Sequence, residues 1–373
     1  MIKEGDMNKM KTIQILTILT IILTTPLILS NITLEKNTTI NESDNDSRNT
    51  YTNITPQIIH VYNNESIQEA INQSQPGDTI YIHNGTYHEH IIINKTLKII
   101  GENKYTTIID GDNEWDAIVF IQTSNVYLSN ITATNQSKDS WEGGIYVIES
   151  FWTSGKRKEI YNITIYNCIV ENCSCGIRCT NTTNIKITNS TIHNNYGTGV
   201  YVIDSTNTTI DNCTVYKNGQ ENRGGGITIW DSSEGMQTRG SVIIRNCRIY
   251  ENLWVGIDIS NSLINKGKLA NITICNNIID NNNAPYNKPG RGIDIRRTTN
   301  ITIKNNIITN HQTDIQKIAG EGIYLSDCKK TTIEKNNITK NRIGIKIWSH
   351  YKNTIPNYTI KNNNFIKNKI QAE

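Results

Sequence analysis

A short internal repeat constrains the fold of this chain more than any other feature of its sequence. Each copy holds an Asn, a run of alternating apolar residues, two further Asn and a Gly-Ile-x-Ile segment, and nine copies can be aligned. The shortest spacings between copies are 22 and 23 residues. A period of that size with short alternating segments predicts a β-solenoid. The copies start near Asn125, Asn162, Asn184, Asn207, Ser241, Asn271, Asn300, Lys330 and Asn357.

Each copy predicts three short strands. The first strand turns two apolar residues inward, as Ile163 and Ile165, and the second turns one inward, as Val170. Parallel crossovers are right-handed, so the fold class predicted is all-β: a single-stranded right-handed parallel β-helix with three parallel sheets. The third strand follows a Gly, and its first inward residues form one expected interior column of Ile145, Ile177, Val200, Ile227, Ile257, Ile293, Ile323 and Ile345.

Asn and Gly have expected roles at the corners of the coils. Asn tolerates the left-handed conformation, and its amide can bond the same Asn one coil away. The Gly that opens each third strand, such as Gly256, is expected to relax a corner that a residue with a Cβ would turn less easily. One candidate ladder of turn residues consists of Asn277, Asn306, Asn336 and Asn363.

A short capping helix is predicted at the N-terminal end of the solenoid. Ser66-Ile67-Gln68-Glu69 has the pattern of a capping box and is followed by Ala70 and Ile71. Such a helix would cover the apolar edge of the first coil. Strands at Thr79–Ile82 and His90–Ile93 are expected to begin the stack, and the β-helix is expected over residues 58–373.

The residues before the β-helix predict an exported protein. Lys9 and Lys11 precede an apolar run from Ile13 to Leu29, so residues 1–30 are predicted to be a signal peptide or an N-terminal membrane anchor. Residues 31–57 have few large apolar side chains and predict a disordered Asn/Thr-rich linker. The predicted location is extracellular or at the cell surface. Glycosylation sequons in the linker, typical of a surface glycoprotein, lie at Asn31, Asn37, Asn41, Asn45 and Asn53.

Charge and cysteine usage limit the possible partners. A net charge of +3 without an Arg-rich motif argues against a nucleic-acid partner, and membrane contact is expected only through the N-terminal segment. Cys168, Cys213 and Cys247 occupy equivalent repeat positions and predict a buried stack of side chains. Cys213 and Cys247 would lie within disulfide reach, and the sequence does not decide whether they are bonded. Cys173, Cys175 and Cys179 have no His close by in the sequence, so no metal centre is predicted there.

The face of the Gly-led strands is the candidate binding face. Long segments enter and leave these strands at several coils, and insertions gathered on one face of a repeat protein usually mark its binding surface. Aromatic rings suit sugar rings; stacking of these rings on one another along the sheet is the alternative, and the loops on the same face favour sugar binding. The aromatic residues of this face are Trp141, Tyr146, Trp152, Tyr201, Trp230, Trp254, Tyr324 and Trp348.

Two aspartates form the sharpest polar feature of that face. Gly-Ile-Asp-Ile occurs twice, which places Asp258 and Asp294 outward on successive coils, about 5 Å apart at the backbone. Two such close carboxylates do not both ionise easily without a cation or a shared proton. Three roles are compatible with this pair of aspartates: a salt-bridged surface, a catalytic pair and a Ca²⁺ site. Further candidate substrate contacts are Asp231, Arg296 and Asp327, and Arg291 and Arg297 are expected near Asp294.

The chain resembles a known superfamily over nearly all of the residues after the linker. The segment Ser66–Gly111 (SIQEAINQSQPGDTIYIHNGTYHEHIIINKTLKIIGENKYTTIIDG) and the nine coils resemble the pectin-lyase-like β-helix superfamily, in particular its carbohydrate-binding and sugar-hydrolase branch, which includes NosD-type periplasmic proteins. The resemblance implies the fold, whereas activity differs among members, which include lyases, hydrolases, epimerases and adhesins.

No functional residue follows from the resemblance. The polygalacturonase signatures Asn-Thr-Asp, Asp-Asp, Gly-His-Gly and Arg-x-Lys are absent, as are the pectate-lyase motifs. The NosD likeness implies copper delivery, but the histidines show no ligand cluster beyond His88 and His90 on one strand face, so copper is not predicted.

Two classes of function remain open at this point. The first is a surface protein of the adhesin type that binds a polysaccharide or glycan on the Gly-led face and needs no cofactor. The second is a polysaccharide-degrading hydrolase or lyase that uses Asp258 and Asp294 as catalytic residues, with Ca²⁺ as a conceivable cofactor. The linker and its sequons favour the first class.

Overall fold

The computed structural model describes residues 55–148, 159–220, 224–232, 240–262, 269–282, 290–312, 320–349 and 357–372. The predicted signal or anchor, nearly all of the predicted linker, and Trp152 lie outside the described residues. Within the described ranges, no helix combines the length and apolar character needed to cross a membrane. Residues Ile54–Glu373 form one compact unit.

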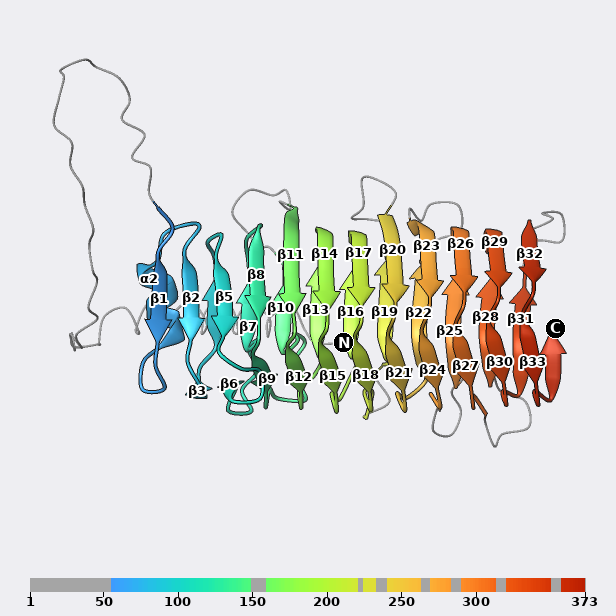
Figure 1. Ribbon diagram of the computed structural model, residues 1–373, viewed down its shortest axis with the longest axis horizontal. Coiled ribbons are helices and arrows are strands. Elements are labelled where there is room, and N and C mark those ends of the chain that lie inside the picture. The colour runs from blue at the N-terminus through green and yellow to red at the C-terminus, as the bar shows by residue number, and fades with distance from the viewer. Residues whose placement is uncertain are drawn as a thin grey trace, which may run out of the picture. The chain divides into compact units, whose positions relative to one another are not determined.

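This unit is a parallel β-helix of three sheets, in which each coil adds one strand to each sheet (Figure 1). Sheet A has 12 strands in the described residues, and sheets B and C have 11 each. The all-β fold class predicted from the repeat is confirmed. All pairs are parallel and join successive coils, as Ile163 does with Ile185 in sheet A.

The strand bounds follow the repeat closely. Sheet A consists of β1 (Ile58–Val61), β2 (Thr79–Ile82), β5 (Lys98–Gly101), β8 (Val126–Ser129), β11 (Ile160–Tyr166), β14 (Thr182–Thr188), β17 (Thr206–Asp211), β20 (Gly240–Arg245), β23 (Leu269–Cys275), β26 (Thr299–Lys304), β29 (Lys329–Glu334) and β32 (Tyr358–Lys361). Sheet B consists of β3 (Gly85–His88), β6 (Thr107–Asp110), β9 (Thr132–Thr134), β12 (Ile169–Glu171), β15 (Thr191–His193), β18 (Thr214–Tyr216), β21 (Arg248–Tyr250), β24 (Ile278–Asp280), β27 (Ile307–Thr309), β30 (Asn337–Thr339) and β33 (Asn364–Ile366). Sheet C, which contains the Gly-led strands, consists of β4 (Ile91–Ile93), β7 (Val119–Ile121), β10 (Ile145–Val147), β13 (Ile177–Thr180), β16 (Val200–Ile203), β19 (Ile227–Asp231), β22 (Val255–Asn261), β25 (Arg291–Arg296), β28 (Glu321–Ser326), β31 (Ile343–Trp348) and β34 (Ile370–Ala372).

The interior is the column of apolar side chains that the repeat predicted. From Ile145 to Ile345, each of the eight expected residues is the register partner of the next, and none of them is exposed. Isoleucine and valine suit this position because a β-branched side chain packs well on a pleated, fully buried surface.

The asparagine ladder forms, but its residues are not the ones that adopt the left-handed conformation, which the repeat did not reveal. Each of Asn277, Asn306 and Asn336 donates from Nδ2 to the Oδ1 of its equivalent one coil further on. The left-handed conformation falls instead on the preceding residue, such as Asn276 (φ 58°) and Asn305 (φ 55°). The expectation that one Asn performs both tasks at this corner is therefore wrong. A ladder residue must aim its amide inward, and a separate residue turns the chain.

A second buried ladder runs along the opposite end of the sheet B strands, and sequence reasoning missed it. It joins Asn218, Asn252 and Asn282 through Nδ2–Oδ1 bonds and continues through His311 to Asn341. His311 is fully buried and takes the place of an Asn.

The strand-opening glycines are required for space. The strand-opening glycines in the described strands do not have a positive φ, whereas Gly77, Gly219 and Gly320 do. A Cβ on Gly256 would lie 2.7 Å from the carbonyl oxygen of Gly292 and 2.9 Å from Nδ2 of Asn282 in the ladder. Our expectation that Gly relaxes a strained corner is thus corrected: the neighbouring coil leaves no room for a side chain.

The N-terminal helix α2 (Ile67–Gln73) forms where it was predicted. Ser66 Oγ accepts a hydrogen bond from the Glu69 backbone N–H at 3.1 Å, as an N-cap does. The carboxylate that accepts the N–H groups of Ile67 and Gln68 belongs to Glu89. Ile67, Ala70 and Ile71 are buried in the core, and the role of the helix as a lid stays a prediction.

The cysteines are buried and unpaired. All eight lie in described segments as free thiols, and Cys168, Cys213 and Cys247 belong to the turn stack that the repeat predicted. Ser190 and Asn277 occupy the same stack, because each accepts the backbone N–H of the cysteine one coil before it. Burial raises the pKa of Cys175 to about 12, so this thiol stays protonated at physiological pH.

Candidate functional site

The outward side of sheet C carries two parallel rows of side chains. Because successive residues of a strand point to opposite faces, the residues between the two inward columns point outward. We call the first row the central row; its register partners are Phe120, Tyr146, Arg178, Tyr201, Thr228, Asp258, Asp294, Tyr324 and Lys346. We call the next row the lateral row; it contains Ile203, Trp230, Ser260, Arg296, Ser326 and Trp348.

Asp294 is fully buried and is held by two arginines. Its Oδ2 accepts a hydrogen bond from Arg291 at 2.6 Å, and its Oδ1 accepts one from Arg296 Nε at 2.9 Å. A second Arg296 nitrogen also donates to Oδ2. Arg291 in turn donates to Glu321 at 2.9 Å. The predicted surroundings of Asp294 are confirmed for Arg291 and Arg296, and Glu321 is a member that sequence reasoning missed.

Asp258 lies one strand away from Asp294 in the same row but has a different environment. Its side chain is half-buried, and its Oδ1 is sealed from solvent and has no hydrogen-bond partner among the described residues. Burial, followed by the negative charge of Asp294, raises the pKa of Asp258 to about 7. The pair therefore combines one arginine-held carboxylate with one carboxyl group that exchanges its proton near neutral pH.

The tyrosines of the central row are stacked against arginines. The Arg178 guanidinium lies 5.3 Å from the ring centre of Tyr146 and 5.7 Å from that of Tyr201. Tyr146 is also stacked on Phe120, with ring centres 5.4 Å apart, and is buried. The Arg291 guanidinium lies 3.9 Å from the ring centre of Tyr324. Arg178 was missed, although the repeat alignment puts it at the same position as Tyr146 and Tyr201.

The tryptophans differ in their exposure. Trp348 is 50% exposed and Trp141 is 80% exposed, whereas Trp230 and Trp254 are half-buried. Trp230 and Trp348 occupy the lateral row four strands apart, so at about 4.8 Å per strand their Cα atoms are separated by roughly 19 Å. Arg296 lies midway between them. The lateral row thus has an aromatic side chain at each end of its charged centre.

Two other predicted contact residues are less accessible. Asp231 is fully buried at the end of β19. Asp327 is half-buried in a left-handed turn, and its Oδ2 accepts a hydrogen bond from Ser326 Oγ at 3.1 Å. Neither carboxylate belongs to the two outward rows.

The charge around the aspartate pair disfavours a bridging Ca²⁺ ion. Both oxygens of Asp294 already accept hydrogen bonds from guanidinium groups, and Ca²⁺ needs six to eight oxygen ligands. Two cationic side chains at the same carboxylate would also repel the ion. The arrangement is better suited to proton exchange at Asp258.

Several solved structures have a similar fold. The A-module of the mannuronan C-5 epimerase AlgE4 from Azotobacter vinelandii is similar with a TM-score of 0.57 at 17% identity, covering 82% of this chain and 91% of that one. The N-terminal fragment of gene product 12 from bacteriophage Phi29 gives a TM-score of 0.55 at 17% identity, covering 80% and 58%. XylC in complex with xylose gives 0.53 at 9% identity, covering 81% and 71%. At these identities the likeness establishes the fold alone.

The family follows from the sequence match. No curated protein matches the chain. The family described as right handed beta helix region matches residues 28–243 and 175–365, which together span most of the sequence. The match agrees with the right-handed parallel β-helix that the repeat predicted, with the pectin-lyase-like superfamily that the chain resembles, and with the three parallel sheets. The chain therefore belongs to the right-handed β-helix family.

Proposed function

We propose that the protein binds a polysaccharide along the outward side of sheet C. The observation that carries this proposal is the lateral row, in which Trp230 and the exposed Trp348 lie on either side of Arg296. Sugar rings stack on such aromatic surfaces, while hydroxyl and carboxylate groups bind the polar residues between them. The tyrosines of the central row contribute less ring surface, because Arg178 and Arg291 already lie on them.

The shape of the face suits an extended polymer. The rows run along the helix axis and cross many strands, so a long chain can contact several coils at once. The names of two proteins with this fold include a carbohydrate: mannuronan for the epimerase module and xylose for the XylC complex. We extend that chemistry to this chain as part of the proposal. The proposed place of action is the cell exterior, on the basis of residues 1–30.

Binding assays with a panel of neutral and acidic polysaccharides test the proposal. Trp348→Ala and Trp230→Ala should each weaken binding by about 1 to 3 kcal/mol, the range of a central aromatic anchor. Tyr161→Ala is the matched control, because Tyr161 is similarly exposed at 44% but lies on sheet A. If both tryptophan variants bind every polysaccharide as the parent does, the face is not the binding surface.

A second candidate function is cleavage of the bound polysaccharide, and Asp258 is the observation that favours it. A binding surface does not need a carboxyl group with a sealed oxygen and a pKa of about 7, whereas an acid or base works best with a pKa near the operating pH. In this reading Asp258 exchanges the proton, and burial, followed by the charge of Asp294, keeps its pKa high.

Asp258→Asn separates the two functions. An enzyme would lose turnover by several orders of magnitude while retaining its ligand, whereas a binding protein would keep its affinity nearly unchanged. Release of reducing ends or unsaturated products from the polysaccharide that binds is the measurement. If the parent yields no product from any bound polysaccharide, the function is binding alone.

A further inference from the structure

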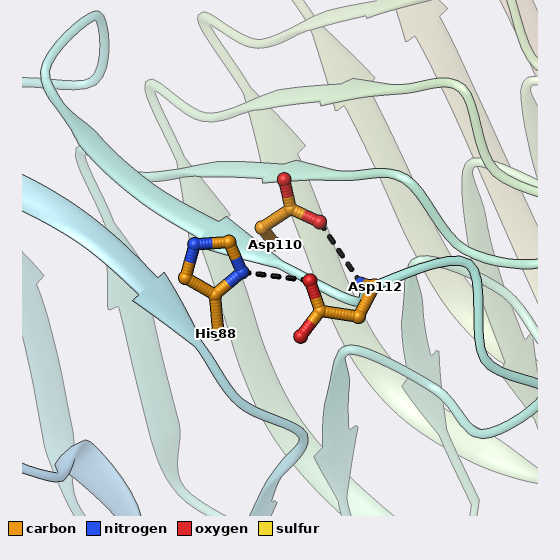
Figure 2. Close-up of side chains that lie close together, drawn as sticks. All are labelled: His88, Asp110 and Asp112. Atoms are coloured by element: carbon orange, nitrogen blue, oxygen red, sulfur yellow. Dashed lines mark hydrogen bonds and ion pairs between the residues drawn. The ribbon is translucent and has the colours of Figure 1, made fainter.

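A second cluster of polar side chains lies on sheet B, near the N-terminal end of the β-helix. His88 and Asp110 are register partners on the neighbouring strands β3 and β6, so their side chains emerge side by side on the outer face. Asp112 follows in the turn after β6. Figure 2 shows His88 turned toward Asp112, with Asp110 beside them. One ligand atom from each of the three residues lies within 4.8 Å of the other two.

The two carboxylates are oriented by their neighbours. Asp110 Oδ1 accepts hydrogen bonds from the Asp112 backbone N–H at 2.9 Å and from Asn135 Nδ2 at 2.8 Å. Both donors reach the same oxygen, which leaves Oδ2 of Asp110 for another partner. Asp112 Oδ1 lies 2.7 Å from His88 Nδ1.

The carboxylates of this cluster face an imidazole and, among the described residues, none of the guanidinium groups that hold Asp294. In the part of the chain that the structure describes, no lysine or arginine forms an ion pair with Asp110 or Asp112. Two carboxylates and one imidazole thus converge without a fixed cation. An imidazole nitrogen together with carboxylate oxygens is a ligand set for first-row transition metals such as Zn²⁺.

We propose that His88, Asp110 and Asp112 bind a divalent first-row transition metal ion through Nδ1 of the imidazole and one oxygen of each carboxylate. The ion takes the place of the proton between His88 and Asp112, and that proton is released to solvent on binding. Water molecules complete the coordination, since the cluster is open to solvent. Asn135 is a positioning residue that fixes Asp110. This site is independent of the polysaccharide face proposed for sheet C.

The chain contains a close internal control for this site. Glu171 and His193 occupy the same outer row of sheet B, because His88, Asp110, Thr134, Glu171 and His193 are successive register partners. His193 Nε2 lies 3.5 Å from Glu171, so one imidazole meets one carboxylate, and the described residues supply no third ligand there. This pair contains the same chemical groups with one carboxylate fewer.

Calorimetric titration of the full-length protein with Zn²⁺, supported by the visible spectrum of the Co²⁺ form, tests the proposal. We expect one saturable site whose affinity falls at least tenfold in His88→Gln and in Asp110→Asn, and is unchanged in His193→Gln. Asn135→Gly, which keeps the left-handed φ of 65° at this position, should weaken it by roughly tenfold, the lower end of effects on groups that orient metal ligands. Thermal unfolding of each metal-free variant verifies that it is folded.

Two outcomes would overturn the metal site. One is a His88→Gln variant that binds Zn²⁺ as the parent does. The other is a parent with no saturable binding, in which case the cluster is an ordinary ion pair. Polysaccharide binding should be the same in all four variants, so failure of either proposal leaves the other open.

Discussion

Asp258 and Asp294 are register partners on β22 and β25, yet two arginines hold only Asp294, while one oxygen of Asp258 has no hydrogen-bond partner in the part of the chain that the structure describes. The two aspartates therefore differ in their partners, although only one coil separates them. Burial, followed by the negative charge of Asp294, favours the protonated form of Asp258. A carboxyl group whose pKa is raised toward neutrality is typical of acid–base sites, although salt-bridged surfaces also produce one.

Asp258→Asn should stabilise the protein at alkaline pH. The pKa of Asp258 is raised from 3.8 to about 7, so the folded state binds this proton more tightly than the unfolded state. Stability from this group is complete below about pH 4 and is lost as the pH rises through 7. An asparagine resembles the protonated form. We expect a gain of about 2 to 4 kcal/mol in unfolding free energy at pH 8.5 and almost none at pH 4. Urea unfolding at both pH values measures it, and an equal gain at both would contradict the raised pKa.

Asp294→Asn should have the opposite effect. It leaves Arg296 without its buried partner and Arg291 with Glu321 alone, and the loss of one member of a buried ion pair costs about 3 to 5 kcal/mol. Asp211→Asn is the control, since Asp211 pairs with the exposed Arg245 and should cost less than about 1 kcal/mol. The alkaline loss of stability should also become smaller in Asp294→Asn, because Asp258 then lacks the neighbouring negative charge, while burial still raises its pKa. Equal costs for the two variants would show that the arginines do not depend on Asp294.

The interior of this fold can be predicted from its sequence, but the chemistry of its surface can only partly be predicted. Alternating isoleucines have one inward arrangement that buries them, so the column through Ile257 follows from the spacing alone. The row that contains Asp258 and Asp294 follows from the same register. The unpartnered oxygen of Asp258 does not, since it depends on the rotamers of the arginines around it. The cluster of His88 and Asp110 was missed because the first coils lack the Asn-Gly pattern that sets the register elsewhere.

His311→Asn should protect the protein from acid. Complete burial lowers the pKa of His311 from 6.5 to about 4, so the unfolded state binds this proton more readily and stability is lost as the pH falls from 6.5 toward 4. Asparagine is the residue of the same ladder in the neighbouring coils, where Asn282 and Asn341 lie. We expect the variant to be more stable than the parent by about 3 kcal/mol near pH 4 and equally stable above pH 7.5. Thermal unfolding over this pH range measures the difference. An advantage that persists unchanged at pH 8 would mean that packing, and not the proton, causes it.

Asn306→Ala should be far more destabilising than the loss of an asparagine from an exposed ladder. Nδ2 of Asn306 donates to the Ile274 carbonyl and to Asn336, and its Oδ1 accepts from both nitrogens of Asn277. Alanine leaves several of these buried groups without partners, at about 1 to 3 kcal/mol each, so a loss of about 3 to 5 kcal/mol is expected. Asn184→Gly is the matched control, because Asn184 forms ladder bonds to Asn162 and Asn207 at the surface and glycine keeps its left-handed φ of 57°. Water replaces those exposed bonds, so the control should lose less than about 1 kcal/mol. Chemical unfolding of both variants measures the contrast, and similar losses would show that burial of the inner ladder does not determine its contribution.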